Sequence, residues 1–261
     1  MRIKLILNIV GEEAIIPINY QYYISSFIYK CINSADNQFS EWLHDKGFTA
    51  GNKTFKLFTF SNLYIPEREI KGSFIKIKSK KIELIISMIS EKIYDNLIIG
   101  MFRNQTFNLN HREINISFPI QSVEMMPEPE FSDTMKFRAI TPIVISKKSE
   151  YMGKESEIYM NPLEKDYTYY LKKNLEDKYI AYSANSDKQF IEYSIEEIKI
   201  ARNTKSKLIT VCEGRKEETK VKGYLYDFEI KGAPEIIKFA YNAGLGKLSS
   251  LGFGCIKPIN G

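Results

Sequence analysis

The sequence predicts an α+β protein in which one order of helices and strands occurs twice. Hydrophobic periodicity alternates between the two-residue period of strands and the 3.6-residue period of helices. Residues 125–130 contain two prolines and two glutamates, show neither period, and divide the chain near its middle. The 261 residues, of which 44% are hydrophobic, suffice for one large domain or two small ones. We therefore expect one domain over 1–124 and another over 133–261, with a linker over 125–132.

The first half is predicted to run strand, helix, strand, strand, helix, strand. A helix is expected where apolar residues recur three and four positions apart between Ile24 and Ile32. A short second helix is expected to end at Gly47, because glycine is favoured just past a helix C-terminus. The isoleucines of 81–95 also have helical spacing. The expected strands are 2–10, 54–64, 72–79, 97–102 and 112–122, and the expected helices are 20–34, 37–46 and 81–95.

The second half is predicted to repeat nearly the same order. Prolines at the start of both expected helices support them, because proline is favoured in a first helical turn. The expected strands are 134–146, 190–200, 206–213, 221–230 and 255–257, and the expected helices are 163–178 and 234–243. A βαββαβ unit is the ferredoxin-like motif, so this order predicts two tandem ferredoxin-like domains. The sheet of such a domain is a common platform for RNA.

Composition narrows the class of protein further. The net charge of +5 and the isoelectric point of about 8.8 are compatible with nucleic-acid binding without demanding it. Three cysteines without CxxC spacing cannot all pair, which predicts a reducing, cytoplasmic compartment. The charged first strand does not resemble a signal peptide, and no apolar run reaches membrane-spanning length, so no membrane partner is expected.

The residue types also bear on metals and cofactors. Two histidines and three scattered cysteines make a metal site built from these residues improbable. Counting does not exclude a carboxylate site for Mg²⁺, but no paired-aspartate motif is present. We therefore expect neither a metal nor another cofactor.

The segment 244–254 reads Gly-Leu-Gly-Lys-Leu-Ser-Ser-Leu-Gly-Phe-Gly, and we call it the glycine loop. Successive backbone N–H groups in such a loop can form a concave anion site, which predicts a phosphate clamp with Phe253 exposed. The loop is not a Walker A motif, because Leu248 follows Lys247, and Ser249 replaces the third glycine of a dinucleotide-binding fingerprint. These mismatches argue against a nucleotide-binding regulator or kinase-like enzyme. The alternative is a structural loop that returns the last strand to its sheet.

Three side chains could together perform acid–base chemistry. Tyr29 lies off the apolar stripe of its helix, and His44 lies in the last turn of the next helix, where the helix dipole favours a protonated imidazole. Lys56 lies among aromatic residues, with Lys53 as a nearby competitor. Each alone has an ordinary explanation as a solvated tyrosine, a capping histidine or a snorkelling lysine. Together they suit metal-free RNA cleavage, in which a 2′-hydroxyl attacks phosphorus. His111, in contrast, is expected on the surface.

Several motifs carry a resemblance to a known family. The glycine loop resembles the glycine-rich signature of the RAMP superfamily. The motifs near the start of the chain resemble those of the CRISPR-associated endoribonucleases that cut precursor CRISPR RNA within its repeats. These motifs are Pro17-Ile-Asn-Tyr-Gln-Tyr-Tyr23, Ile28-Tyr29, Trp42-Leu-His44 and Lys56-Leu-Phe-Thr-Phe-Ser61. The resemblance spans nearly the whole chain and is strongest at its two ends.

The resemblance implies tandem ferredoxin-like domains and metal-independent cleavage that leaves a 2′,3′-cyclic phosphate and a 5′-hydroxyl. It implies Tyr29, His44 and Lys56 as catalytic residues. The loop 44–53 is longer than in the family, so Lys53 stays open as the alternative lysine. The implied RNA-binding residues are Lys53, Gly244, Gly246, Lys247, Ser249, Ser250, Gly252, Phe253 and Gly254.

CRISPR repeat RNA is the implied partner. Other subunits of an interference complex and a homodimer stay open as further partners. The main alternative function is that of a non-catalytic RAMP subunit that binds guide RNA.

Overall fold

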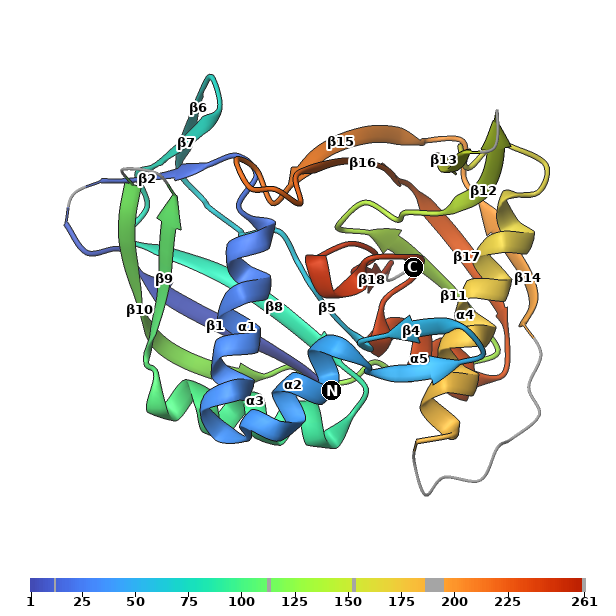
Figure 1. The fold of residues 1–261 in the computed structure, drawn as a ribbon, viewed down its shortest axis with the longest axis horizontal. Coiled ribbons are helices and arrows are strands. Elements are labelled where there is room, and N and C mark those ends of the chain that lie inside the picture. Colours follow the sequence, from blue (N-terminus) through green and yellow to red (C-terminus); the bar gives the residue numbers. More distant parts are fainter. Residues whose placement is uncertain (12, 112–113, 152–153, 186–194, 260–261) are drawn as a thin grey trace.

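The computed structural model describes residues 1–11, 13–111, 114–151, 154–185 and 195–259. Two antiparallel sheets lie side by side, each with helices packed on it, and one hydrophobic core runs from the first half into the second (Figure 1). No helix in these described ranges combines the length and the hydrophobicity that crossing a bilayer requires.

The first half is built on a five-stranded sheet in the order β5-β8-β1-β10-β9. Helices α1 and α3 pack against each other on one face of this sheet, and short strands form two accessory sheets, β2-β7-β6 and β3-β4. The main elements are β1 (Arg2–Asn8), α1 (Gln21–Ala35), α2 (Asn37–Asp45), β5 (Phe58–Phe60), β8 (Lys81–Met88), α3 (Glu91–Arg103), β9 (Thr106–His111) and β10 (Ile114–Met125). The accessory strands are β2 (Ala14–Pro17), β3 (Phe48–Ala50), β4 (Lys53–Phe55), β6 (Arg68–Lys71) and β7 (Phe74–Ile77).

The second half is built on a four-stranded sheet in the order β14-β17-β11-β18. Its elements are β11 (Thr134–Ala139), α4 (Tyr167–Ser183), β14 (Ile195–Ile200), β17 (Asp227–Gly232), α5 (Pro234–Ala243), the short 3-10 helix η1 (Ser249–Leu251) and β18 (Ile256–Pro258). Two hairpins are inserted, β12 (Ser146–Tyr151) with β13 (Lys154–Tyr159), and β15 (Lys205–Val211) with β16 (Thr219–Leu225). Both main sheets place the strands of a βαββαβ unit in the order 2-3-1-4, so the prediction of tandem ferredoxin-like folds is confirmed.

The predicted helix over 81–95 is wrong. Residues 81–88 form β8, with Ile82, Leu84 and Ile86 buried at alternate positions. The isoleucine spacing fits both periods, and β-branched residues favour the strand. Helix α3 starts later, where the Ser90 side chain accepts a hydrogen bond from Ile93 N as an N-cap. The strand predicted over 97–102 is therefore also wrong, because these residues lie inside α3.

Other differences concern the ends of elements. The strand expected over 54–64 is interrupted between β4 and β5, where Leu57 has a φ of 56°. The strand expected over 221–230 is two strands, β16 and β17, and α4 begins at Tyr167 rather than near 163. Residues 112–113 and 190–194 of two expected strands lie outside the described residues.

The buried Arg2 joins the two halves of the molecule. Its guanidinium donates to Ser87 Oγ of β8 at 2.9 Å, to the Ile256 carbonyl at 2.7 Å and to the Tyr241 carbonyl. It also lies 3.3 Å from the ring centroid of Tyr241. A buried cation needs such complete hydrogen bonding to offset its desolvation. Arg2 therefore holds β1 and β8 against α5 and β18, a role with no signal in the sequence pattern.

Candidate active site

Tyr29 and His44 meet where α1 and α2 pack against each other. Their ring centroids are 5.4 Å apart, with the rings nearly perpendicular. Tyr29 also contacts the ring of Phe58 in β5, with the ring centroids 5.7 Å apart, and its hydroxyl interacts with the Ser250 side chain of η1. Burial raises the pKa of the Tyr29 phenol well above its ordinary value. Tyr29 is therefore a neutral phenol near pH 7, able to donate a hydrogen bond but not to act as a base.

His44 is the exposed member of this pair. Its side chain is 71% exposed, and its Nδ1 lies 2.9 Å from Oδ1 of Asp45. A carboxylate at Nδ1 favours the tautomer that carries its proton there, which leaves Nε2 directed away from Asp45. The orienting Asp45 was missed in the sequence analysis, although it directly follows His44. An exposed, oriented imidazole can exchange a proton with a bound ligand.

Lys56 completes the group from the link between β4 and β5. Its Nζ donates to the His44 carbonyl at 2.6 Å. A Cβ at Gly47, which has a φ of 64°, would lie 3.1 Å from Lys56 Cδ and 2.6 Å from the Phe55 carbonyl, so glycine leaves room for the lysine to cross the end of α2. Partial burial lowers the pKa of Lys56, while the Asp45 carboxylate acts in the opposite direction.

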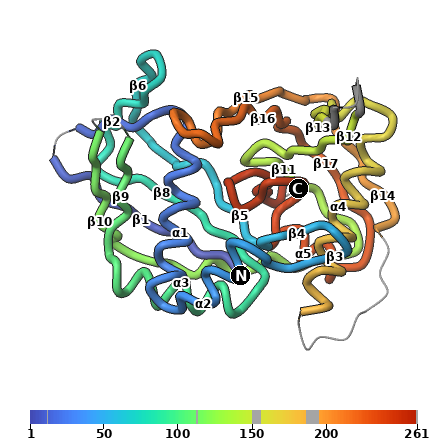
Figure 2. Tube along the Cα trace, viewed as in Figure 1, coloured from blue at the N-terminus to red at the C-terminus, as the bar shows by residue number. Residues whose placement is uncertain are grey.

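Lys53 lies elsewhere. Its Nζ is 2.5 Å from Oδ2 of Asp177 in α4, so it joins the β3–β4 hairpin to the second half. Figure 2 shows this blue hairpin running beside α4. The structure thus brings Lys56, and not Lys53, to His44. Lys56 precedes β5, in which the neighbouring rings of Phe58 and Phe60 are fully buried.

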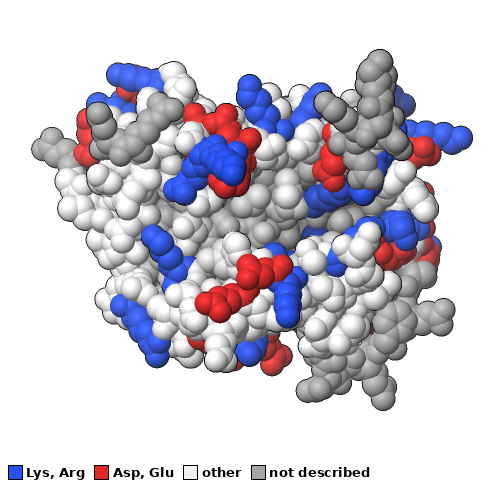
Figure 3. All heavy atoms as spheres, in the orientation of Figure 1, with Lys and Arg blue, Asp and Glu red and all other residues white. Residues whose placement is uncertain are grey.

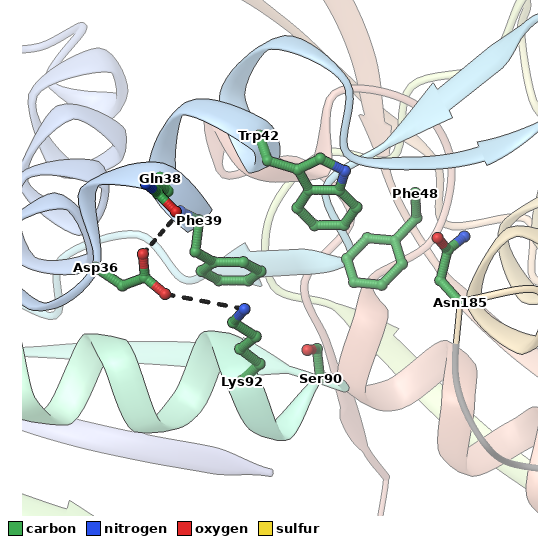
Figure 4. Close-up of a pocket in the computed structure, with 8 residues that line it drawn as sticks. All are labelled: Asp36, Gln38, Phe39, Trp42, Phe48, Ser90, Lys92 and Asn185. Carbon is green, nitrogen blue, oxygen red and sulfur yellow. Dashed lines mark hydrogen bonds and ion pairs between the residues drawn. The ribbon is translucent and has the colours of Figure 1, made fainter.

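The residues around a cavity of about 430 Å³ beside α2 hold this helix in place. The rings of Phe39 and Trp42 from α2 and of Phe48 from β3 stand together in it, with centroid distances of 5.5 and 5.3 Å (Figure 4). Lys92 of α3 lies 4.5 Å from the Phe39 centroid and 3.8 Å from Asp36, the N-cap of α2. These contacts fix α2 against α3 and β3, and thereby fix the position of His44.

The glycine loop is mostly buried. Phe253 is 1% exposed, so the expectation of an exposed phenylalanine is wrong. Its ring packs with Val144, Val211 and Val221 and so anchors the β15–β16 hairpin. The backbone of the loop contacts β5, because Thr59 Oγ1 donates to the Phe253 carbonyl at 2.9 Å. The buried glycines of the loop are Gly244, Gly246, Gly252 and Gly254.

The expected phosphate clamp is also not formed by most of the loop's amides. Six of the eleven N–H groups, those of residues 244, 245, 247, 251, 252 and 254, already donate to carbonyl groups of the chain. Lys247 is held by Ser146 Oγ at 2.7 Å and Glu157 Oε1 at 2.8 Å, and Ser249 is buried. Ser250 is the loop side chain that interacts with Tyr29. Contact between the glycine loop and RNA therefore stays a prediction, whereas packing between the halves is its observed role.

Lys178 of α4 is hydrogen-bonded to the start of the glycine loop. Its side chain is 1% exposed, and its Nζ donates to the Gly244 carbonyl at 2.8 Å. Its place in the core was not predicted from the sequence, although it continues the buried stripe of Leu171, Leu175 and Tyr182 at helical spacing.

The prediction for the second histidine, His111, was wrong. His111 is 5% exposed and its Nδ1 lies 2.6 Å from the Tyr23 hydroxyl, so it is not a surface residue.

We expect the free energy of unfolding to rise between pH 7 and 8.5, and to rise less in Lys178→Met. Burial lowers the pKa of Lys178 from 10.5 to about 7, so in this window the unfolded state binds one more proton than the folded state. Stability then rises by on the order of 1 kcal/mol per pH unit from this group. Urea denaturation of both proteins at pH 7, 7.75 and 8.5 would measure the slopes. Equal slopes would show that Lys178 stays charged when buried.

The fold defines a protein built from two tandem ferredoxin-like units. Two family models match the chain, "CRISPR-associated protein Cas6, N-terminal" over residues 15–123 and "CRISPR associated protein Cas6, C-terminal" over residues 126–258. The chain belongs to the Cas6 family, as its resemblance predicted.

Relatives and solved structures agree with this assignment. The chain is 27% identical to the CRISPR-associated endoribonuclease Cas6 1 of Methanocaldococcus jannaschii, over 98% of this chain and 92% of the relative. It is 25% identical to a CRISPR-associated endoribonuclease-like protein Cas6 of Pyrococcus furiosus, over 99% of both. A solved structure described as CRISPR associated protein Cas6 superposes with a TM-score of 0.76 at 26% identity, covering 100% of this chain and 99% of that one.

Proposed function

We propose that this protein is an endoribonuclease that cleaves precursor CRISPR RNA within its repeats by attack of a 2′-hydroxyl. The observation that carries the proposal is the convergence of Tyr29, His44 and Lys56, which come from α1, α2 and the β4–β5 link. Relatives named as CRISPR-associated endoribonucleases support the substrate class. The proposed partner is therefore CRISPR repeat RNA.

The proposed reaction needs no water nucleophile. The 2′-oxygen forms a bond to the adjacent phosphorus, and the bond from phosphorus to the 5′-oxygen breaks. The 2′-hydroxyl loses its proton and the leaving 5′-oxygen gains one, which yields a 2′,3′-cyclic phosphate and a 5′-hydroxyl. An acid–base group and a cation beside the phosphorane are the groups that such a step requires.

The geometry suggests one role for each side chain. His44 exchanges the proton through Nε2, while Asp45 holds its Nδ1. Tyr29 donates a hydrogen bond from a neutral phenol and so orients the 2′-hydroxyl or a phosphate oxygen, and burial raises the pKa of this phenol further above neutral pH. Lys56 places an ammonium at the His44 carbonyl, at the end of α2, and there stabilises the negative charge that develops on the phosphorane.

The test of this function is cleavage of the repeat RNA from the protein's own locus in the presence of EDTA. A second RNA with a single 2′-deoxy substitution at the cut site serves as the control. One discrete cut that is lost in the 2′-deoxy RNA would support metal-free attack by the 2′-hydroxyl. Tight binding of both RNAs without any cut would instead favour the guide-RNA-binding subunit. Cleavage of the 2′-deoxy RNA would overturn the proposed chemistry.

We expect Lys56→Ala to slow cleavage by roughly 10- to 1,000-fold, because it removes a cation from the developing charge. Lys53→Ala is the matched control and should leave the rate within about threefold. The Lys53 ammonium is occupied by Asp177, and loss of a half-exposed ion pair costs at most about 1 kcal/mol of stability. Single-turnover rates at saturating protein measure both effects. The reverse ranking would assign the catalytic cation to Lys53.

A further inference from the structure

A polar groove of about 350 Å³ lies between α1 and the edge strand β9, outside the candidate active site. Its walls come from one side of α1, from residues 104–110, and from Arg215 in the turn between β15 and β16. In Figure 1 this hairpin reaches across the molecule to the N-terminal end of α1. Asn19 holds the hairpin at this end of α1, because its side-chain amide donates to Glu213 Oε2 at 2.9 Å and accepts a hydrogen bond from Thr210 N at 3.4 Å.

Strand β9 offers its backbone to this groove. It is the last strand of its sheet and pairs with β10 alone among the described strands. The Gln105 carbonyl accepts a hydrogen bond from Ile120 N at 2.9 Å, so residue 105 is hydrogen-bonded to β10. In an antiparallel pair, residues that are hydrogen-bonded to the partner strand alternate with residues whose backbone groups point away from it. The N–H and C=O groups of residues 106, 108 and 110 therefore point away from β10. These same residues, Thr106, Asn108 and Asn110, line the groove.

The charge of the groove favours an anionic ligand. Lys30 and Arg215 both line the groove, and no aspartate or glutamate is among the described residues that line it. The Arg215 guanidinium lies 4.5 Å from the centroid of the Tyr22 ring, so a cation and an aromatic ring stand together at one end. Elsewhere on the face drawn in Figure 3, basic and acidic side chains are interspersed, with a recess between the two halves.

The groove and the candidate active site share one helix. Lys30 directly follows Tyr29 in α1, and Tyr22 lies seven residues before Tyr29, about 10 Å along the helix axis. A strand of RNA at Tyr29 could therefore continue along the same helix into the groove. Unpaired RNA needs cations for its phosphates, aromatic rings for its bases, and backbone or amide groups for base edges and 2′-hydroxyls. All of these groups line the groove.

We propose that the groove between α1 and β9 binds an unpaired segment of the substrate RNA, next to the reacting phosphate. The proposal rests on the proposed function for its substrate, and it adds a site that contributes affinity and no chemistry. An extended peptide could also pair with the edge of β9. The two cations and the absence of lining carboxylates favour RNA.

The test compares Lys30→Ala/Arg215→Ala with the control Lys80→Ala/Lys165→Ala, which removes the same charge from exposed lysines outside the groove. The probe is the repeat RNA of the protein's own locus, and its Kd is measured by fluorescence anisotropy over a range of salt concentrations. We expect the groove variant to bind about tenfold more weakly than the control. Its salt slope should fall by roughly 1.4, for two lost phosphate contacts at about 0.7 each.

Lys30→Glu is the second variant, because Lys30 is exposed and its replacement does not touch the docked hairpin. It should also weaken binding while leaving the melting temperature unchanged. If the affinity and salt slope of both groove variants match the control, the proposal is overturned, and the open edge of β9 is then a candidate for a protein strand. The binding assay does not require cleavage. A protein that binds RNA through the groove but does not cut would therefore contradict the proposed function alone.

Discussion

His44→Ala should lower the single-turnover rate of repeat-RNA cleavage by about 100- to 10,000-fold while the Kd for the RNA stays within about threefold. The imidazole is the group placed to move the proton, and loss of a general acid–base typically costs rates of this order. The side chain is 71% exposed, so its removal leaves the core intact and the melting temperature unchanged. Gel-based rates at saturating protein, with anisotropy for binding, separate the two effects.

Two companion variants sharpen this test. Asp45→Asn keeps the shape of the group that contacts His44 Nδ1 but removes its charge, and should slow cleavage because a neutral amide holds the Nδ1 proton less strongly. Tyr29→Phe keeps the ring that packs on His44 and Phe58 but removes the hydroxyl, and should slow cleavage less than His44→Ala does. Cleavage by His44→Ala at the wild-type rate would remove His44 from the mechanism and favour a different acid–base group.

Gly254→Ala should destabilise the fold by about 4 kcal/mol, the largest effect expected for any single methyl group in the glycine loop. Gly254 has a φ of 73°, and a Cβ there would lie 1.8 Å from the Leu245 carbonyl oxygen. The left-handed conformation alone costs alanine about 1–2 kcal/mol, and forcing backbone atoms apart adds several more. The two ends of the loop, which are joined by a hydrogen bond from Leu245 N to the Gly254 carbonyl at 2.9 Å, would have to separate. Thermal unfolding would measure the loss.

Gly51→Ala is the control that separates the steric clash of the added Cβ from the cost of the left-handed backbone conformation. Its φ of 59° is similar, but nothing lies within 4 Å of its Cβ position. It should therefore lose only about 1 kcal/mol, from the left-handed conformation. The melting temperatures of the two variants should differ by roughly 8 °C, since each kcal/mol shifts a protein of this size by about 2–4 °C. Equal losses would mean that the contact with Leu245 relaxes without cost.

Burial of the glycine loop shows where the motif misled the sequence analysis. Glycines permit both an open anion nest and a close approach of backbones, and the sequence pattern is the same for both. The choice depends on partners that are distant in sequence, such as Thr59 and Val144. Phe253 is buried for the same reason, because the β15–β16 hairpin supplies the valines that cover it.

The position of the lysine and the pKa of the tyrosine in the candidate site also depend on contacts with residues distant in sequence. Residue spacing left both Lys53 and Lys56 near His44. Docking of the β3–β4 hairpin on α4 then turned Lys53 to Asp177 and left Lys56 at the end of α2. The raised pKa of Tyr29 follows from its burial, to which η1, some 220 residues later in the chain, contributes.

The sequence predicted the order of most elements, the two ferredoxin-like units, the end of α2 beside His44 and the family of the protein. These features depend on periodicity, capping and motifs, which act over a few residues and can be read along the chain. It failed at 81–95, where isoleucine spacing suits both a helix and a strand. Only the tertiary structure decided which lysine meets the imidazole, which face of α1 borders a polar groove, and what the glycine loop packs against. Those choices depend on desolvation and close packing between segments far apart in sequence, for which a local pattern carries no signal.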